Sequence, residues 1–177
     1  SNMIRSSRGF ALIDLIFVAG IIGLLCSIAV PKLLLAKQAA GAASAIGTLR
    51  TVGSSQLTFA LTCGSGFYAP DLLTLGTAPP GSNEPFIGPD MSSSNMIQKS
   101  SYTFRLEATP YPGAPPSCNG TPSGGTGQGF KAAADPTEPT NFRFFASNSN
   151  GQLYEDSVTL WDDMPEVGDP TVGAILH

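Results

Sequence analysis

An apolar run near the N-terminus constrains this chain more than any other feature. Residues 10–30 contain one charged side chain, Asp14, among apolar and small residues. As a helix rising about 1.5 Å per residue, the run is roughly 30 Å long, which matches the hydrocarbon core of a bilayer. The sequence therefore predicts one membrane-spanning helix.

Charges around the run predict its orientation. Arg5 and Arg8 lie just before it, and the first charge after it is Lys32. Because basic flanks tend to stay in the cytoplasm, we expect the N-terminus inside and the bulk of the chain outside.

Two simpler interpretations are a signal anchor and a secretory signal peptide that is cut near the end of the run. The run is too long for a normal signal-peptide core and continues into more helix, which disfavours the second. Asp14 disfavours a plain anchor, because a carboxylate in an apolar helix is unfavourable unless a partner outside that helix compensates it.

The start of the run carries a specific pattern. Its members are Arg8, Gly9, Phe10, Asp14, Gly23 and Pro31. In order and spacing they resemble the N-terminal signature of type IV pilins and pseudopilins, over residues 4–35. The resemblance implies that a prepilin peptidase cuts after Gly9 and that the new N-terminal Phe10 is methylated.

Asp14 departs from the family, which normally has Glu at this fifth position of the processed chain. The resemblance implies that the carboxylate neutralises the N-terminal ammonium of a neighbouring subunit during assembly, a pairing that a low dielectric strengthens. Asp is shorter by about 1.5 Å, so the same pair requires a small adjustment of register. The alternative is that Asp14 merely tolerates a place near the membrane interface.

Pro31 falls where the family has its helix-interrupting proline. Because proline lacks the N–H donor, we expect Pro31 to kink or locally melt the helix, with Gly23 adding compliance.

These features divide the chain into four parts. Residues 1–2 precede Met3 and look like the remnant of a cleaved expression tag, and 3–9 form a leader. Residues 10–30 form the transmembrane and assembly helix, and 31–177 an extracytoplasmic head that begins with the second half of the helix.

The helix is expected to continue to about Cys63 as an amphipathic segment. Its apolar residues recur at three- and four-residue steps, at Leu35, Ala39, Ala42, Ile46, Leu49 and Val52. The small residues Ala40, Gly41 and Ala43 are expected to let neighbouring helices approach.

Alternation of apolar and polar residues predicts strands at 102–108, 141–147 and 152–157, with a hairpin turn at Asn150-Gly151. Residues 158–161 are expected to add a short strand or to pack as a tail. We therefore expect an α+β fold of pilin-like form, in which the long helix packs on a small antiparallel sheet of three to four strands.

Two segments are expected to be loops. Residues 64–100 are rich in Gly, Pro, Ser and Asn, with one helical turn at 71–75. Residues 109–140 are expected to be a long exposed insertion between the first two strands.

The three cysteines separate by location. Cys26 lies in the membrane run, whereas Cys63 and Cys118 lie in the exported part, where oxidation is permitted. We predict a Cys63–Cys118 disulfide, with two free thiols as the alternative.

Other chemistry has little support in the sequence. The net charge of −4 argues against a nucleic-acid partner. The one histidine is His177, and no phosphate loop, nucleophile elbow or metal-ligand cluster is present, so we expect no enzyme and no cofactor. Asn119 begins a sequon that we treat as chance.

Calcium is a weaker possibility, because oxygen-rich loops can bind it. Acidic residues gather toward the C-terminus, at Glu155, Asp156, Asp162, Asp163, Glu166 and Asp169. Their spacing matches no calcium loop, and acidic turns are usually solvated.

The resemblance implies a structural filament subunit, stored in the inner membrane as a single-pass precursor and later part of an extracellular or periplasmic filament. Its partners would be identical or related pilin subunits, the prepilin peptidase and an inner-membrane assembly platform. Such filaments, or fimbriae, serve adhesion and motility. The alternatives are a pseudopilin of a type II secretion system and a monomeric membrane-anchored binding protein, which predicts no processing at Gly9.

Overall fold

The computed structural model of this chain describes residues 6–177. The predicted tag remnant and the first part of the predicted leader, residues 3–5, lie outside the described residues. The chain forms two compact units, Ser1–Ala40 and Gly41–His177, which we describe separately.

One long helix, α1 (Ser6–Thr62), runs through both units. Its C-terminal end agrees with the end predicted near Cys63. The helix continues through Pro31 without a break, so the local melting expected there is not observed. Proline removes one backbone donor, and the hydrogen bonds of the neighbouring turns keep the helix continuous.

The second unit contains an antiparallel sheet whose strand order follows the chain, β1-β2-β3-β4-β5-β6. Its strands are β1 (Met96–Lys99), β2 (Tyr102–Glu107), β3 (Lys131–Pro136), β4 (Phe144–Asn148), β5 (Leu153–Asp156) and β6 (Ala174–Ile175). The α+β class is confirmed. The prediction of three to four strands is wrong, because the described residues form six.

The three predicted strands correspond to β2, β4 and β5, whereas β1, β3 and β6 lie in segments predicted as loops or left unassigned. The strand β3 interrupts the supposed insertion at 109–140 and pairs with β2 and β4 on either side. Residues 158–161 form no strand and instead pack as a tail, with Leu160 fully buried.

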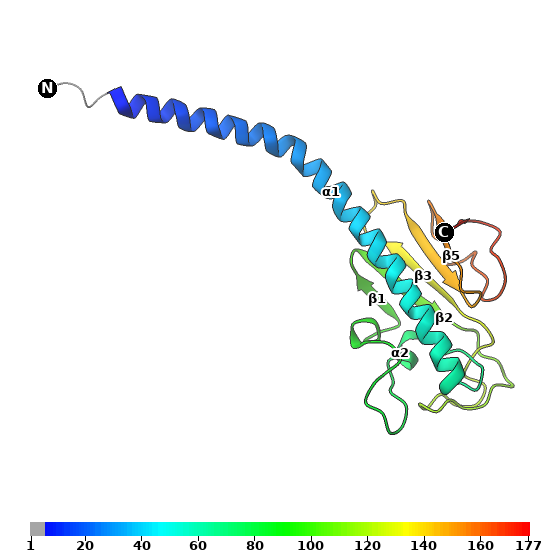
Figure 1. The fold of residues 1–177 in the computed structure, drawn as a ribbon. Helices are drawn as coiled ribbons and strands as arrows, with labels where there is room; N and C mark the ends of the chain where they lie inside the picture. The colour runs from blue at the N-terminus through cyan, green and yellow to red at the C-terminus, as the bar shows by residue number, and fades with distance from the viewer. Residues whose placement is uncertain (1–5) are drawn as a thin grey trace. The chain divides into compact units, whose positions relative to one another are not determined.

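The part of α1 that begins at Gly41 packs on one face of the sheet (Figure 1). Leu49, Val52 and Phe59 from the helix share a core with Phe104 and Phe145 from the sheet. Of the expected helix stripe, Ala42, Leu49 and Val52 are buried and Ile46 is partly buried, whereas Leu35 and Ala39 are exposed.

The opposite face of the sheet is covered by the tail that follows β5. Leu160 and Met164 pack there against Ala133, Ala146 and Tyr154. The strands β3 and β4 are therefore buried on both faces.

Gly41 was expected to face a neighbouring helix, but it faces the sheet of its own chain. A Cβ atom at this position would lie 2.9 Å from the carbonyl oxygen of Ser100, in the turn between β1 and β2. Gly41 thus lets the helix approach its own sheet, while Ala40 and Ala43 are exposed.

Two short helices lie in the segment between α1 and β1. They are α2 (Leu72–Leu75) and the 3₁₀ helix η1 (Pro89–Met91). The helical turn predicted at 71–75 is confirmed by α2. The helix starts there because the Asp71 side chain caps it by accepting a hydrogen bond from the Thr74 N–H at 2.8 Å.

Candidate functional site

The first candidate site is the exposed apolar part of α1. Every large apolar side chain between residues 10 and 35 is exposed, the least so being Ile21 at 42%. Among the described residues, α1 is the one helix long and apolar enough to cross a membrane. Apolar surface of this extent is typical of helices that a bilayer or other apolar helices cover.

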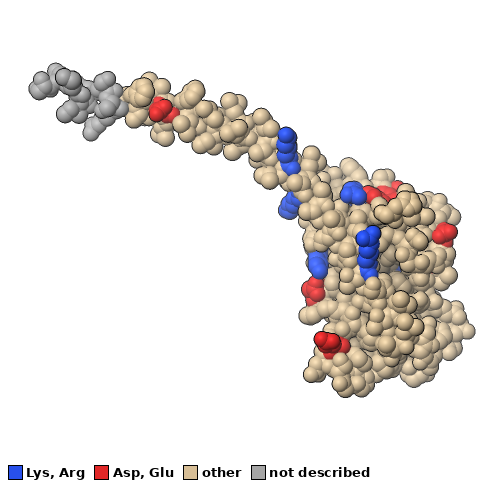
Figure 2. Space-filling view, in the orientation of Figure 1, with Lys and Arg blue, Asp and Glu red and all other residues tan. Residues whose placement is uncertain are grey.

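Asp14 is isolated on this segment. Figure 2 shows a patch of acidic red on the otherwise tan N-terminal part of the helix. Within residues 6–177, Asp14 makes no hydrogen bond and no ion pair. On insertion scales an unpaired carboxylate is unfavourable by about 2.5 to 3.5 kcal/mol at the centre of a bilayer and by less near its edge, so inside a membrane Asp14 would need a compensating group from another molecule or from the interface.

The residues of the predicted processing site are accessible. Gly9 and Phe10 both lie on α1 and are exposed, and a Cβ atom at Gly9 would meet nothing within 4 Å. Gly23 is equally open, and Pro31 is exposed. The structure therefore places these residues along one helix rather than in a pocket.

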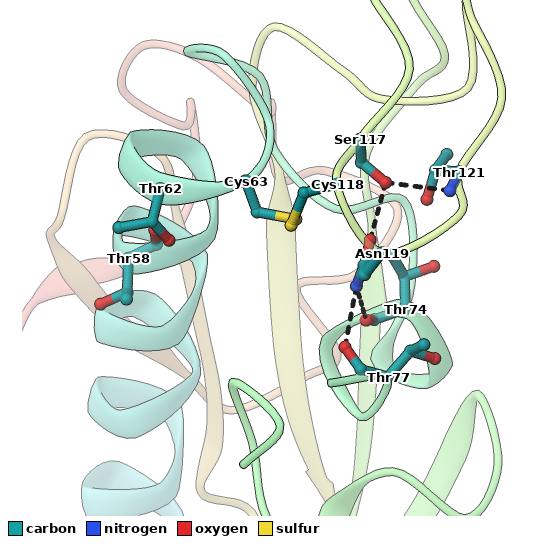
Figure 3. Close-up of a disulfide and its surroundings, with 9 residues drawn as sticks. All are labelled: Thr58, Thr62, Cys63, Thr74, Thr77, Ser117, Cys118, Asn119 and Thr121. Carbon is teal, nitrogen blue, oxygen red and sulfur yellow. Dashed lines mark hydrogen bonds between the residues drawn. A yellow bond between two sulfur atoms is a disulfide. The ribbon is translucent and has the colours of Figure 1, made fainter. Parts of the chain in front are cut away.

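The second candidate site is the end of α1, where the predicted disulfide is confirmed. Cys63 and Cys118 are bonded, with their Cα atoms 4.8 Å apart (Figure 3). The Cys118 N–H also donates a hydrogen bond to the Cys63 carbonyl at 3.0 Å. Cys26 is free and exposed.

Asn119, next to the disulfide, holds the loop to α2. Its Nδ2 donates to the carbonyl oxygens of Thr74 and Thr77 at 2.8 and 2.9 Å, and its Oδ1 accepts from Ser117 at 2.6 Å (Figure 3). The amide nitrogen that glycosylation would modify is therefore engaged in structural hydrogen bonds.

Several acidic residues near the C-terminus make separate contacts and do not gather at one site. Glu155 pairs with Arg143 at 2.6 Å, and Glu166 accepts from the Thr109 N–H at 2.6 Å. Asp169 accepts from the Tyr154 hydroxyl at 3.0 Å. In the part of the chain that the structure describes, no three His, Cys, Asp or Glu side chains come together to hold a metal.

Two tyrosines of the sheet have a raised side-chain pKa. Burial raises the pKa of Tyr102, whose hydroxyl donates to the Arg143 carbonyl at 2.9 Å. Burial, and then the hydrogen bond to Asp169, raise the pKa of Tyr154. Both hydroxyls serve as structural anchors, one on each face of the sheet.

No protein family, curated protein or solved structure was found to match this chain. Inferences about function therefore depend on the N-terminal pattern and on the geometry described above.

Proposed function

We propose that this chain is a structural subunit of a type IV pilus or a related filament, made as an inner-membrane precursor and cleaved after Gly9. The observation that carries the proposal is the exposed apolar part of α1, which follows the Gly9-Phe10 pair and contains one isolated carboxylate, Asp14, four residues after Phe10. A bilayer covers such a helix before assembly, and the helices of neighbouring subunits cover it afterwards.

Asp14 supplies the polar contact of this assembly. Cleavage after Gly9 creates a positively charged amine on Phe10, and in the filament this amine lies against the Asp14 carboxylate of a neighbouring subunit. Each charge then compensates the other in a region without water, where an unpaired charge is strongly unfavourable.

The second unit forms the pilin-like head. Its disulfide supports an oxidising, extracytoplasmic location, because such bonds are rare in reducing compartments. The partners are further copies of this chain or related pilin subunits, the prepilin peptidase and the inner-membrane assembly platform. The role is structural rather than catalytic.

Substitution of Asp14 tests the assembly contact. We would produce Asp14→Glu, Asp14→Asn and Asp14→Ala in a host with the assembly machinery, and measure sheared filaments relative to membrane precursor. Glu keeps the charge and should retain filaments, whereas Asn keeps the shape without the charge and should reduce the yield to the level of Ala.

Ser27→Ala is a matched control on the same helix. The Ser27 hydroxyl already donates to the Leu24 carbonyl at 2.7 Å, so its removal should leave the filament yield unchanged. Full filament yield from Asp14→Ala and Asp14→Asn would show that no ion pair is needed.

Two alternatives differ in observable ways. A pseudopilin of a type II secretion system would be processed in the same manner but would polymerise in the periplasm. A monomeric membrane-anchored binding protein would retain the residues before Phe10 and would form no polymer.

A further inference from the structure

A groove of about 480 Å³ lies on the second unit, between α1 and the hairpin formed by β4 and β5. Its walls are largely apolar, with Leu49 and Leu57 from the helix and Leu153 from β5. Two aromatic side chains, Tyr68 and Phe130, pack against each other at a centroid distance of 5.1 Å and also line the groove. This size and lining are typical of small-molecule sites.

Four polar residues that line the groove have side chains without partners. Arg50 and Ser54 come from α1, and Ser147 and Gln152 come from the hairpin. None of these side chains makes a hydrogen bond or ion pair within the described residues. Beside its apolar walls, the groove thus presents several unused hydrogen-bond donors.

Ser147 is the most informative of the four. It is 6% exposed, and its hydroxyl has no hydrogen-bond partner among the described residues. It lies two residues after Phe145 on β4, so its side chain points to the same, helix-facing side of the sheet. Buried hydroxyls are nearly always paired, and a bound molecule would supply the missing partner.

The charge of the groove selects the kind of ligand. Arg50 is the one charged residue among those lining it, in a chain with a net charge of −4. Glu84 lines a neighbouring groove together with Arg50 but forms no ion pair with it. A guanidinium favours carboxylates, because its N–H groups can donate two parallel hydrogen bonds to the two oxygens.

We propose that this groove binds a small monocarboxylate with an apolar body. The carboxylate lies against Arg50 with Ser54 or Gln152 as a further donor, the apolar body lies against the leucines and aromatic rings, and Ser147 gains its missing partner. The groove lies on the second unit and includes none of residues 10–30, the proposed assembly segment of α1, so it does not depend on the proposed filament.

Calorimetric titration of the full chain in neutral maltoside micelles tests the proposal. The probes are phenylbutyrate and its uncharged analogue phenylbutanamide. We expect phenylbutyrate to bind about tenfold more tightly, and Arg50→Gln to remove this preference. Lys99→Gln removes a positive charge outside the groove and should leave both affinities unchanged.

Two glycines of α1 provide a matched pair of variants. Added Cβ atoms at Gly53 and Gly47 would meet nothing within 4 Å, but only Gly53 lines the groove. Both Gly→Leu changes favour the helix, so both proteins should fold. Gly53→Leu should abolish phenylbutyrate binding, and Gly47→Leu should retain it.

Ser147→Ala adds a second readout. Because it removes an unpaired buried hydroxyl, it should raise the denaturation midpoint without ligand while weakening phenylbutyrate binding severalfold. Equal affinities for the two probes, no binding at millimolar concentrations, or binding that survives both Arg50→Gln and Gly53→Leu would overturn the proposal.

Discussion

Removal of the Cys63–Cys118 disulfide should strongly destabilise the second unit. The bond joins residues 55 positions apart, so it restricts a large part of the unfolded chain. For a loop of this length the chain-entropy estimate is about 4 kcal/mol, a large share of the 5 to 15 kcal/mol typical of whole proteins. The Cys63/Cys118 double alanine variant should therefore fold but with a much smaller free energy of unfolding.

Urea denaturation of the full chain in micelles measures this loss. Trp161 is the only tryptophan, and its ring packs against Arg105 and Lys131 on the face of the sheet opposite α1. Its fluorescence therefore reports unfolding of the second unit alone. With a slope of about 2 kcal/mol per molar urea, a 4 kcal/mol loss lowers the midpoint by about 2 M.

Cys26→Ala is the control for this experiment, because Cys26 is free and lies in the first unit. Its midpoint should match that of the unsubstituted protein. If the urea midpoint of the double variant fell by less than about 0.5 M, the hydrogen bonds around the loop would be sufficient to hold it, and the stabilising role of the disulfide would be refuted.

Three further predictions concern the second unit. The Gln56 side chain donates one hydrogen bond to the backbone of Ala69 and accepts another from it, both at 2.8 Å and both buried. Gln56→Leu should therefore lower the free energy of unfolding by about 2 to 4 kcal/mol in urea denaturation. A loss under about 1 kcal/mol would contradict this account. Gly41→Ala should lower the thermal midpoint, because its Cβ would lie 2.9 Å from a backbone oxygen, whereas Gly47→Ala, in open space, should raise it. A shift of the midpoint in the same direction for both variants would contradict this reasoning. Burial raises the pKa of Tyr102 above 10.0, so the folded state remains protonated to a higher pH than the unfolded state. The free energy of unfolding should therefore be constant below about pH 10 and fall above it, and Tyr102→Phe should reduce that fall in a pH series.

The elements that the sequence predicted correctly share a strong local signal. The strand β2 alternates strictly, and Tyr102, Phe104 and Leu106 are buried on one face. The turn before β5 contains Asn150-Gly151, and Gly151 has a φ of 78°, the left-handed conformation that favours glycine. The disulfide followed from the location of the cysteines.

The strand β3 was missed because its sequence lacks such a signal. Ala132, Ala133 and Ala134 are all buried, since α1 covers one face and the C-terminal tail covers the other. A strand buried on both faces shows no alternation, and alanine has a weak preference for strands. Its existence depends on packing that only the complete fold supplies.

The hairpin of β1 and β2 was missed for a different reason. Ser100 and Ser101 form its two-residue turn with φ values of 52° and 64°. Asn and Gly are the residues that usually mark such turns, and a Ser-Ser pair carries no comparable signal. The neighbouring helix helps to hold this turn, because the Ser44 hydroxyl donates to the Ser100 hydroxyl at 3.0 Å.

The proposed assembly residues and the groove also differ in how far the sequence alone reveals them. Phe10 and Asp14 could be selected from the sequence because they stand in a linear pattern at the start of an apolar run. Arg50 and Ser147 could not, because what distinguishes them is the absence of a partner in the folded chain. That property arises only when α1 and the β4–β5 hairpin come together.

The processed N-terminus is the most direct test of the filament proposal. Intact-mass and N-terminal peptide spectrometry of the native protein, isolated from cells that assemble it, should find a chain that begins at Phe10 and carries one methyl group on its amine. A native chain that retains the residues before Phe10, or that begins at any other residue, would contradict the proposal.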